Sequence, residues 1–333
     1  MFQITIPCPI LRCTAVVSAL TVGEHLTLHI SNLSPSDYLE QLLNIVFKHV
    51  RFRATSRTIG MLPTSYDNFM QLPWYDFVML LHGINIATYG YSEDVTLICN
   101  KCGTRFTYRC DKGEIVNAKV WDHHADFSRV VHTVTFDDIH VDLALPTIQS
   151  YVDTFALLTS DHVAQSLDKL LQPLDTCGYL TVITQCIKKG NVTVNQKRDI
   201  YMFYSELPIQ HAVHIIDQYA TTLGIYEPNI MVKTKCHRCQ SDVVYRFDFL
   251  QHLLTSIYQL KQQNETYKLF IDMLVKYNVI GEYTGSINDT LELPYPLFKD
   301  VVLKTIVARA DRAKKLADMS AKKSASIMGM LGK

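Results

Sequence analysis

Two Cys-x-x-Cys pairs are the residues of this sequence best suited to hold a metal ion. The first lies in LICNKCGTRFTYRCD, which begins at Leu97, and the second in KCHRCQSDVVYRFD, which begins at Lys235. Each is followed at the same distance by Tyr-Arg-x-Asp. A Cys-x-x-Cys in a tight turn between two strands supplies half of the tetrahedral ligand set of structural zinc. The sequence therefore predicts one Zn²⁺ shared by Cys99, Cys102, Cys236 and Cys239.

Two other interpretations of these cysteines stay open: two independent pairs, or a redox dithiol. Redox dithiols normally lie at a helix N-terminus, whereas both pairs lie in strand-like stretches. The chain has nine cysteines, and no basic residue precedes Arg12, which makes a poor export signal. In a reducing compartment, paired cysteines favour metal over disulfide. Four thiolates leave no open position for water, so the expected zinc is structural.

Charge around the two pairs is locally basic, although the chain as a whole is neutral. Lys+Arg and Asp+Glu both number 32 in the 333 residues. Neutrality counts against a protein that holds nucleic acid by neutralising phosphates. The local cations fit three roles: offsetting the negative zinc–thiolate site, a protein-partner surface, or a nucleic-acid contact. They are Lys101, Arg105, Arg109, Lys233, Lys235, Arg238 and Arg246.

Hydrophobic periodicity predicts an α+β protein: helical regions plus short β-hairpins, stapled by the split zinc-ribbon-like site. Residues 1–32 are expected to be extended, and no apolar run reaches the ~18 residues that span a bilayer. Pro73 suits the first turn of a helix that Gly90 ends, and Ser205 suits the N-cap of another. Further expected elements are a helix at 34–50, short strands at 133–136 and 140–145, a hairpin at 179–194 that turns near Gly190, and helices to the C-terminus.

The unit of a helix followed by strand, cysteine turn and strand occurs twice in the sequence. It predicts four regions: residues 1–111 with the first cysteine turn, a β-rich and helical insert at 112–204, a second turn at 205–255, and C-terminal helices at 256–333. Because 133 residues separate Cys102 from Cys236, a shared metal would join distant halves of the chain.

The C-terminal stretch combines helical spacing with positive charge and methionine. From Lys304 to Lys333 there are eight Lys or Arg and two acidic residues. One interpretation is a solvated helix. Another is an arm that folds against a protein partner through adaptable apolar contacts, and a third is a membrane-surface helix. The residues expected to bind a partner are Arg312, Lys315, Met328, Met330 and Leu331.

Motifs of known catalytic sites are absent from the sequence, so we expect no enzyme and no small-molecule substrate. There is no Gly-x-Ser-x-Gly, His-Glu-x-x-His, phosphate-loop or dinucleotide fingerprint. The tract WDHHAD, with Asp122, His123 and His124, is the one candidate for a catalytic metal site. We interpret it as a loop with incidental histidines.

A resemblance to a known family follows from the order of five stretches. They are VGEHLTLH, SDYLEQLLNIVFKHV, LPWYDFVMLLHGINIATYG running into VTLICNKCGTRFTYRCD, VDLALPTIQSYVD, and YATTLGIYEPNIMVKTKCHRCQSDVVYRFDFL. In this order they resemble the baseplate hub and hub-assembly proteins of T-even-type contractile-tailed bacteriophages. The resemblance covers roughly residues 15–255.

The resemblance implies a non-enzymatic structural or assembly protein at the phage tail tip. Its expected partners are hub and tape-measure proteins, and its expected location is the virion baseplate, with the host cytoplasm during assembly. Two alternatives stay open: a chaperone of hub assembly that is absent from the particle, and a zinc-ribbon nucleic-acid-binding protein. The zinc carries over only to the four cysteines of the two pairs.

Overall fold

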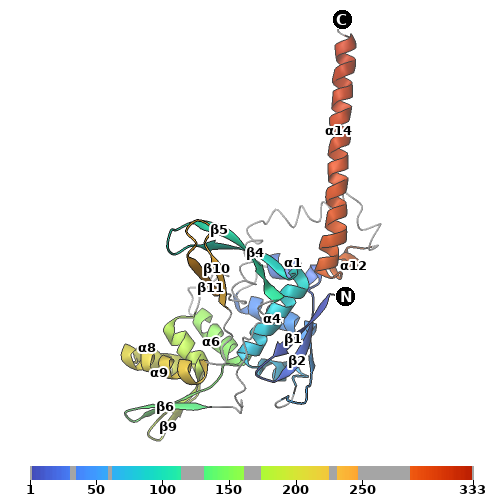
Figure 1. Ribbon diagram of the computed structural model, residues 1–333. Coiled ribbons are helices and arrows are strands. Elements are labelled where there is room, and N and C mark those ends of the chain that lie inside the picture. The colour runs from blue at the N-terminus through green and yellow to red at the C-terminus, as the bar shows by residue number, and fades with distance from the viewer. Residues whose placement is uncertain are drawn as a thin grey trace.

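The computed structural model describes residues 2–30, 35–58, 62–113, 131–160, 174–224, 231–246 and 286–331. Within these ranges the chain is an α+β protein of eleven α-helices, one π-helix and four small antiparallel sheets (Figure 1). The α+β class predicted from the sequence is confirmed.

The first unit of the fold builds a three-stranded sheet and lays a long helix on it. The strand order is β1-β2-β3, and helix α4 packs on β1 and β2. The fit is closest at Gly83, where an added Cβ would lie 2.5 Å from Cγ1 of Ile6. Its elements are β1 (Gln3–Cys8), β2 (Cys13–Ser18), α1 (Val22–Ile30), α2 (Pro35–His49), β3 (Val50–Arg53), α3 (Tyr66–Met70), α4 (Trp74–Tyr89), β4 (Ser92–Ile98) and β5 (Arg105–Asp111).

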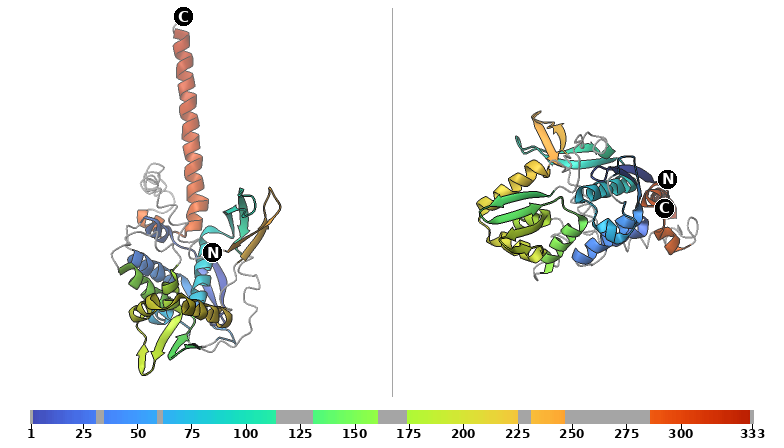
Figure 2. Two further views of the ribbon diagram at one scale, coloured as in Figure 1. Left: turned by 90° about the vertical axis from the view of Figure 1, so that its left-hand side faces the viewer. Right: turned by 90° about the horizontal axis from the view of Figure 1, so that it is seen from below.

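The second unit repeats the order of the first, so the duplication seen in the sequence extends beyond the cysteine turns. In both units two strands precede two helices, a third strand follows the second helix directly, and two more helices lead to a cysteine hairpin. The second unit differs by one added strand, Val192–Val194, before its last two helices. The two units lie side by side (Figure 2). The elements of the second are β6 (His132–Phe136), β7 (Ile139–Leu143), α6 (Ile148–Ser160), α7 (Thr176–Ile183), β8 (Thr184–Lys189), β9 (Val192–Val194), α8 (Lys197–Glu206), α9 (Ile209–Thr222), β10 (Met231–Lys235) and β11 (Asp242–Arg246).

A third, partial copy ends the chain. A short helix is again followed by Leu-Pro and a further helix, which here runs on to the C-terminus. The last helix projects from the body (Figures 1 and 2). These elements are α12 (Ile287–Leu291), α13 (Tyr295–Leu297), the π-helix η4 (Phe298–Leu303) and α14 (Lys304–Leu331).

Two hydrophobic clusters form the core. The first lies between the β1-β2-β3 sheet, α2 and α4, and it also takes in Phe155 of α6 and Val243 of β11. The second lies within the second unit, between its sheet and helices α7 to α9. The second unit therefore joins the first core at two separate places, α6 and the hairpin that carries Cys236.

Several local predictions are confirmed. Helix α2 lies in the expected stretch, and α4 runs from Pro73 at its N-cap to Gly90 at its C-cap, where φ is 90°. The strands expected at 133–136 and 140–145 are β6 and β7. The hairpin expected at 179–194 is confirmed only around Gly190, as β8–β9, because residues 179–183 are the end of α7.

Two local predictions are wrong. Residues 22–30 are not extended but form α1, because Thr21 and Glu24 cap each other's backbone N–H groups in a capping box. Ser205 is not an N-cap but lies inside α8. Helix α8 ends at Glu206 because Leu207 precedes a proline and is extended, with ψ of 134°, and α9 begins after Pro208. The division of the chain at 111, 204 and 255 stays a prediction, and the helices expected at 247–285 lie outside the described residues.

Candidate metal centre

The four predicted cysteines meet in space. All four Sγ atoms lie within 4.8 Å of one another. The two closest pairs join the two halves of the chain: Cys99 to Cys239 at 3.5 Å and Cys102 to Cys236 at 3.6 Å. Four sulfurs around a metal at about 2.3 Å stand about 3.8 Å apart in a tetrahedron. The thiols are free, and their arrangement fits a single tetrahedral metal ion.

Both cysteine turns have the same backbone. In the first, the N–H of Cys99 donates to the carbonyl of Thr104 at 3.0 Å, and the N–H of Gly103 donates to the carbonyl of Cys99 at 2.8 Å. The second turn repeats these bonds, each at 2.9 Å, with Cys236, Ser241 and Gln240. The fifth residue of each turn is left-handed, with φ of 67° at Gly103 and 56° at Gln240. The chain thus folds each pair into a tight turn with both thiols on one side.

Hydrogen bonds to the sulfurs of the first pair, Cys99 and Cys102, favour the thiolate form. The hydroxyl of Ser241 lies 3.2 Å from Sγ of Cys99 and 2.9 Å from Sγ of Cys239. This hydroxyl, with the backbone N–H groups of Cys102 and Lys101, lowers the pKa of Cys99 to about 6. The side chain and backbone of Thr104 lower the pKa of Cys102. A thiol that ionises near neutral pH is ready to bind a metal.

Ser241 and Thr104 are site residues that the sequence interpretation missed. Each stands five positions after the first cysteine of its pair, and each carries a hydroxyl. A hydroxyl residue at the same offset in both turns was the sequence signal that could have identified these two residues.

Apolar packing holds the two hairpins together around the cysteines. Cys99 and Cys236 are fully buried, and Cys102 and Cys239 are half-buried. Strand β11 contacts β4, and the ring of Phe106 meets His237 edge to face at 5.1 Å. The candidate metal therefore lies at a joint between the two units, and its loss would loosen that joint.

The other cysteines and metal candidates are placed as follows. Cys110 is buried in the first core and is not among the clustered thiols. Cys8 and Cys13 face each other across β1–β2 in the same core. Asp122, His123 and His124 lie outside the described residues.

The cations predicted around the cysteine turns point to solvent. Within the described hairpins, exposed side chains are those of Lys101, Arg105, Arg109, Lys233, Lys235 and Arg238. The side chain of Arg246 lies outside the described part of the chain.

The predicted partner-binding arm is the helix α14. Arg312 and Lys315 are exposed on it, as are the apolar side chains of Leu316 and Met319 at 65% and 66%. Met328, Met330 and Leu331 fall in its last turns, where side chains are not described.

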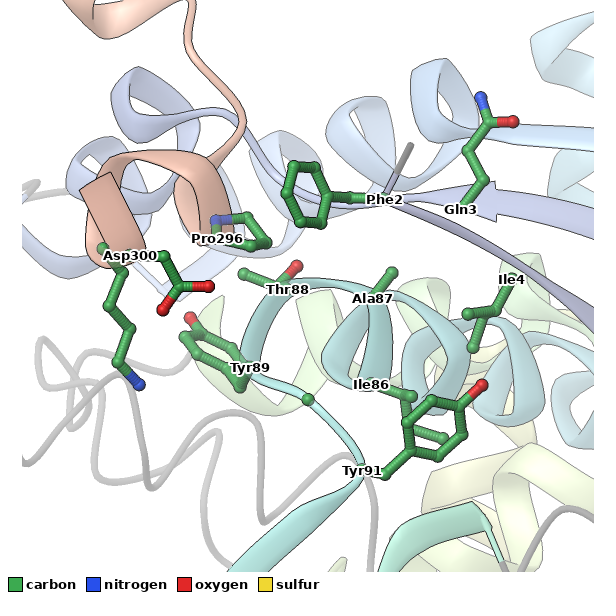
Figure 3. Close-up of a pocket in the computed structure, with 12 residues that line it drawn as sticks. Phe2, Gln3, Ile4, Ile86, Ala87, Thr88, Tyr89, Tyr91, Pro296 and Asp300 are labelled. Carbon is green, nitrogen blue, oxygen red and sulfur yellow. The ribbon is translucent and has the colours of Figure 1, made fainter. Parts of the chain in front are cut away.

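The base of the arm is anchored beside a cavity of about 410 Å³ between β1, the end of α4 and η4 (Figure 3). Phe2, Thr88, Tyr89, Pro296 and Asp300 are among the residues that line it.

Comparison with protein-family models, curated proteins and solved structures found no match. Among the described helices none is long and apolar enough to cross a bilayer.

Proposed function

We propose that the four cysteines bind zinc and that this zinc is structural. Thiolate ligands in a tetrahedral set select zinc over the hard divalent cations, which prefer oxygen. A closed Cys₄ set offers no position for substrate or water, so the ion would stabilise the joint between the two hairpins. The observation that carries this proposal is the meeting of four thiols from segments 137 positions apart, within 4.8 Å.

We further propose that the chain works by binding other proteins and is a component of a contractile-phage tail baseplate hub. The order of its motifs supports the family, and the zinc staple would make the paired hairpins a rigid platform. The helix α14 supports a binding role, because residues 311–319 of this 28-residue helix are all exposed and gain little stability from packing on their own chain. Its expected partners are hub and tape-measure subunits.

Quantitative mass spectrometry of purified phage particles tests this placement, with the chain counted against the tube and sheath subunits. A few copies per particle support a built-in hub component. Absence from particles, together with abundance in infected lysate, would contradict it and favour the assembly chaperone. Truncation of α14 after Asp311 should abolish incorporation while leaving the metal content unchanged.

A nucleic-acid-binding zinc ribbon is the second candidate, favoured by the exposed cations on both hairpins. Retention on DNA or RNA that falls steeply with salt would support it. Matched reversal of Arg105 and Lys233 to Glu should then abolish retention. The balanced net charge of the whole chain argues for the protein-binding role.

A further inference from the structure

Three corners of this molecule share one backbone conformation. Each is a Leu-Pro dipeptide between two helices, and we call them Leu-Pro corners: Leu72–Pro73, Leu207–Pro208 and Leu293–Pro294. The prolines have φ and ψ of −54° and 134°, −55° and 136°, and −56° and 129°. In each, the residue four positions after the proline donates its N–H to the proline carbonyl and is buried: Phe77, Ala212 and Phe298.

The first corner is occupied by another part of the chain. The carbonyl of Leu72 accepts the N–H of Ile148 at 3.0 Å, and the N–H of Trp74 donates to the carbonyl of Pro146 at 2.8 Å. This pair of bonds joins the corner to the start of α6. There Thr147 and Ser150 cap each other's N–H groups.

The third corner is occupied in the same way by the start of α1. The carbonyl of Leu293 accepts the N–H of Val22 at 2.8 Å, and the N–H of Tyr295 donates to the carbonyl of Leu20 at 2.9 Å. Thr21 and Glu24 form the matching capping box. The same pair of backbone hydrogen bonds therefore occurs at two places that are far apart in the sequence.

A ring contact completes both occupied corners. Trp74, one position after its proline, stacks on Tyr151 at 4.0 Å, and Tyr295 stacks on His25 at 3.9 Å. Tyr151 and His25 each stand four positions after the capping threonine. The segment that fills a corner therefore has a defined pattern. An extended residue precedes a Thr; Glu or Ser stands three positions after that Thr, and an aromatic ring stands four positions after it.

The second corner has the same shape and holds no helix start from the described part of the chain. No described backbone group pairs with the carbonyl of Leu207 or the N–H of Ile209. Ile209, which stands where Trp74 and Tyr295 stand, is 68% exposed. Val213, one turn later on the same face of α9, is 48% exposed.

We propose that the corner at Leu207–Pro208 docks the helix start of a partner protein that carries this same repeated unit. The described chain has three corners and two capped helix starts that fit them, so one corner is left over. The partner would donate an N–H to the carbonyl of Leu207, accept from the N–H of Ile209, and lay its ring on Ile209 and Val213.

The two helix starts described in this chain are both filled, so neither of them in a second copy is available to the corner. Phe298 and Thr290 are fully buried beneath the third corner, which holds that segment in place. Docking would then join the second unit of this chain to a capped helix start of its partner. The inference adds a surface to the protein-binding role proposed above and depends on neither the phage placement nor the zinc.

The test uses the full chain and a labelled, acetylated and amidated peptide of residues 143–158 (LALPTIQSYVDTFALL), which is the helix start that fills the first corner. We expect saturable binding by fluorescence anisotropy and slower hydrogen exchange of the Ile209 N–H when peptide is bound. Ile209→Asp should weaken binding at least tenfold, and Ile209→Trp should strengthen it. Val192→Asp, at an equally exposed apolar position on β9, is the matched control and should change nothing.

Two further peptides test the shape of the bound segment. Thr147→Ala with Ser150→Ala, and separately Tyr151→Ala, should each weaken binding to the full chain. The proposal is overturned if neither wild type nor Ile209→Trp binds the peptide. It is equally overturned if Val192→Asp and Ile209→Asp change peptide affinity alike. It is also overturned if peptide binding leaves the hydrogen exchange of the Ile209 N–H unchanged. None of these outcomes alters the metal content or the particle count, so a failure here is distinguishable from a failure of the proposed function.

Discussion

The two units share one order of elements but differ in how much of their second long helix is buried. Thirteen residues of α4 are buried, against three of α9. Helix α4 has the β1-β2-β3 sheet on one side and α6 of the second unit at its first turn. Helix α9 has the second core on one side and an open Leu-Pro corner at its start. Burial of the repeated helix is therefore set by its neighbours, and the more exposed copy has fewer neighbours among the described residues.

Each unit contributes one cysteine hairpin to the candidate metal site. Loss of one cysteine ligand should therefore have the largest effect on stability. We expect Cys236→Ser to abolish stoichiometric metal binding and to lower the free energy of unfolding by at least about 4 kcal/mol, the range typical of a lost structural metal. Urea denaturation with metal analysis of the purified variant measures both. Cys177→Ser, at a half-buried cysteine outside the cluster, should keep the metal. An unchanged metal content in Cys236→Ser would refute the shared site.

Three positions after the proline, the first unit buries a carboxylate where the second has His211. Asp76 accepts the N–H groups of Ile10 and Leu11 at 3.0 and 2.9 Å. Asp76→Ala should cost about 2–4 kcal/mol, because it leaves two buried N–H groups without acceptors. Chemical denaturation measures the cost. A loss below about 1 kcal/mol would show that water replaces the carboxylate.

The same carboxylate makes a pH prediction with a definite sign. Burial raises the pKa of Asp76 from 3.8 to about 7. The two N–H donors lower this pKa, but their effect is smaller than that of burial. Between these values the folded chain holds a proton that the unfolded chain has lost, so the free energy of unfolding contributed by this group falls as the pH rises. Asp76→Asn should remove this dependence. Denaturation of both proteins at pH 5 and pH 7 checks it, since the other groups contribute equally to both.

The filled and open corners give the next prediction. Trp74→Ala should lower the free energy of unfolding by about 2 kcal/mol, because it removes a half-buried ring stacked on Tyr151. Ile209→Ala, at the equivalent position, should change it by less than about 0.5 kcal/mol in the isolated chain. Equal losses in the two variants would mean that the second corner is already covered.

The smallest effect is expected where the two cysteine turns differ. Gly103 and Gln240 hold the same left-handed position, which favours glycine. Gly103→Gln should cost about 1 kcal/mol. Gln240→Gly should be neutral or slightly stabilising. Thermal melts of the metal-loaded variants measure both, and a stabilising Gly103→Gln would contradict the equivalence of the turns.

The metal ligands could be predicted from the sequence because their geometry is local. A Cys-x-x-Cys between strand-like stretches dictates its own turn, and two copies at matched offsets from Tyr-Arg-x-Asp complete the set. Helix α1 was missed although Thr21 and Glu24 carried its signal, because the apolar alternation before them was extended through residue 32.

The Leu-Pro corners lay beyond sequence reasoning. Leu-Pro before a helix is a common local pattern. Only the packing shows that two corners hold capped helix starts and that the corner at Leu207–Pro208 holds none from the described residues. The partner surface therefore follows from tertiary contacts, whereas the metal centre follows from residue spacing.

X-ray absorption at the zinc edge, with metal analysis of the full chain purified under reducing conditions without chelator, tests the central claim most directly. We predict one zinc per chain with four sulfur neighbours at about 2.3 Å. A chain without bound metal, or a zinc ion with only two sulfur neighbours, would contradict a site shared between Cys99, Cys102, Cys236 and Cys239.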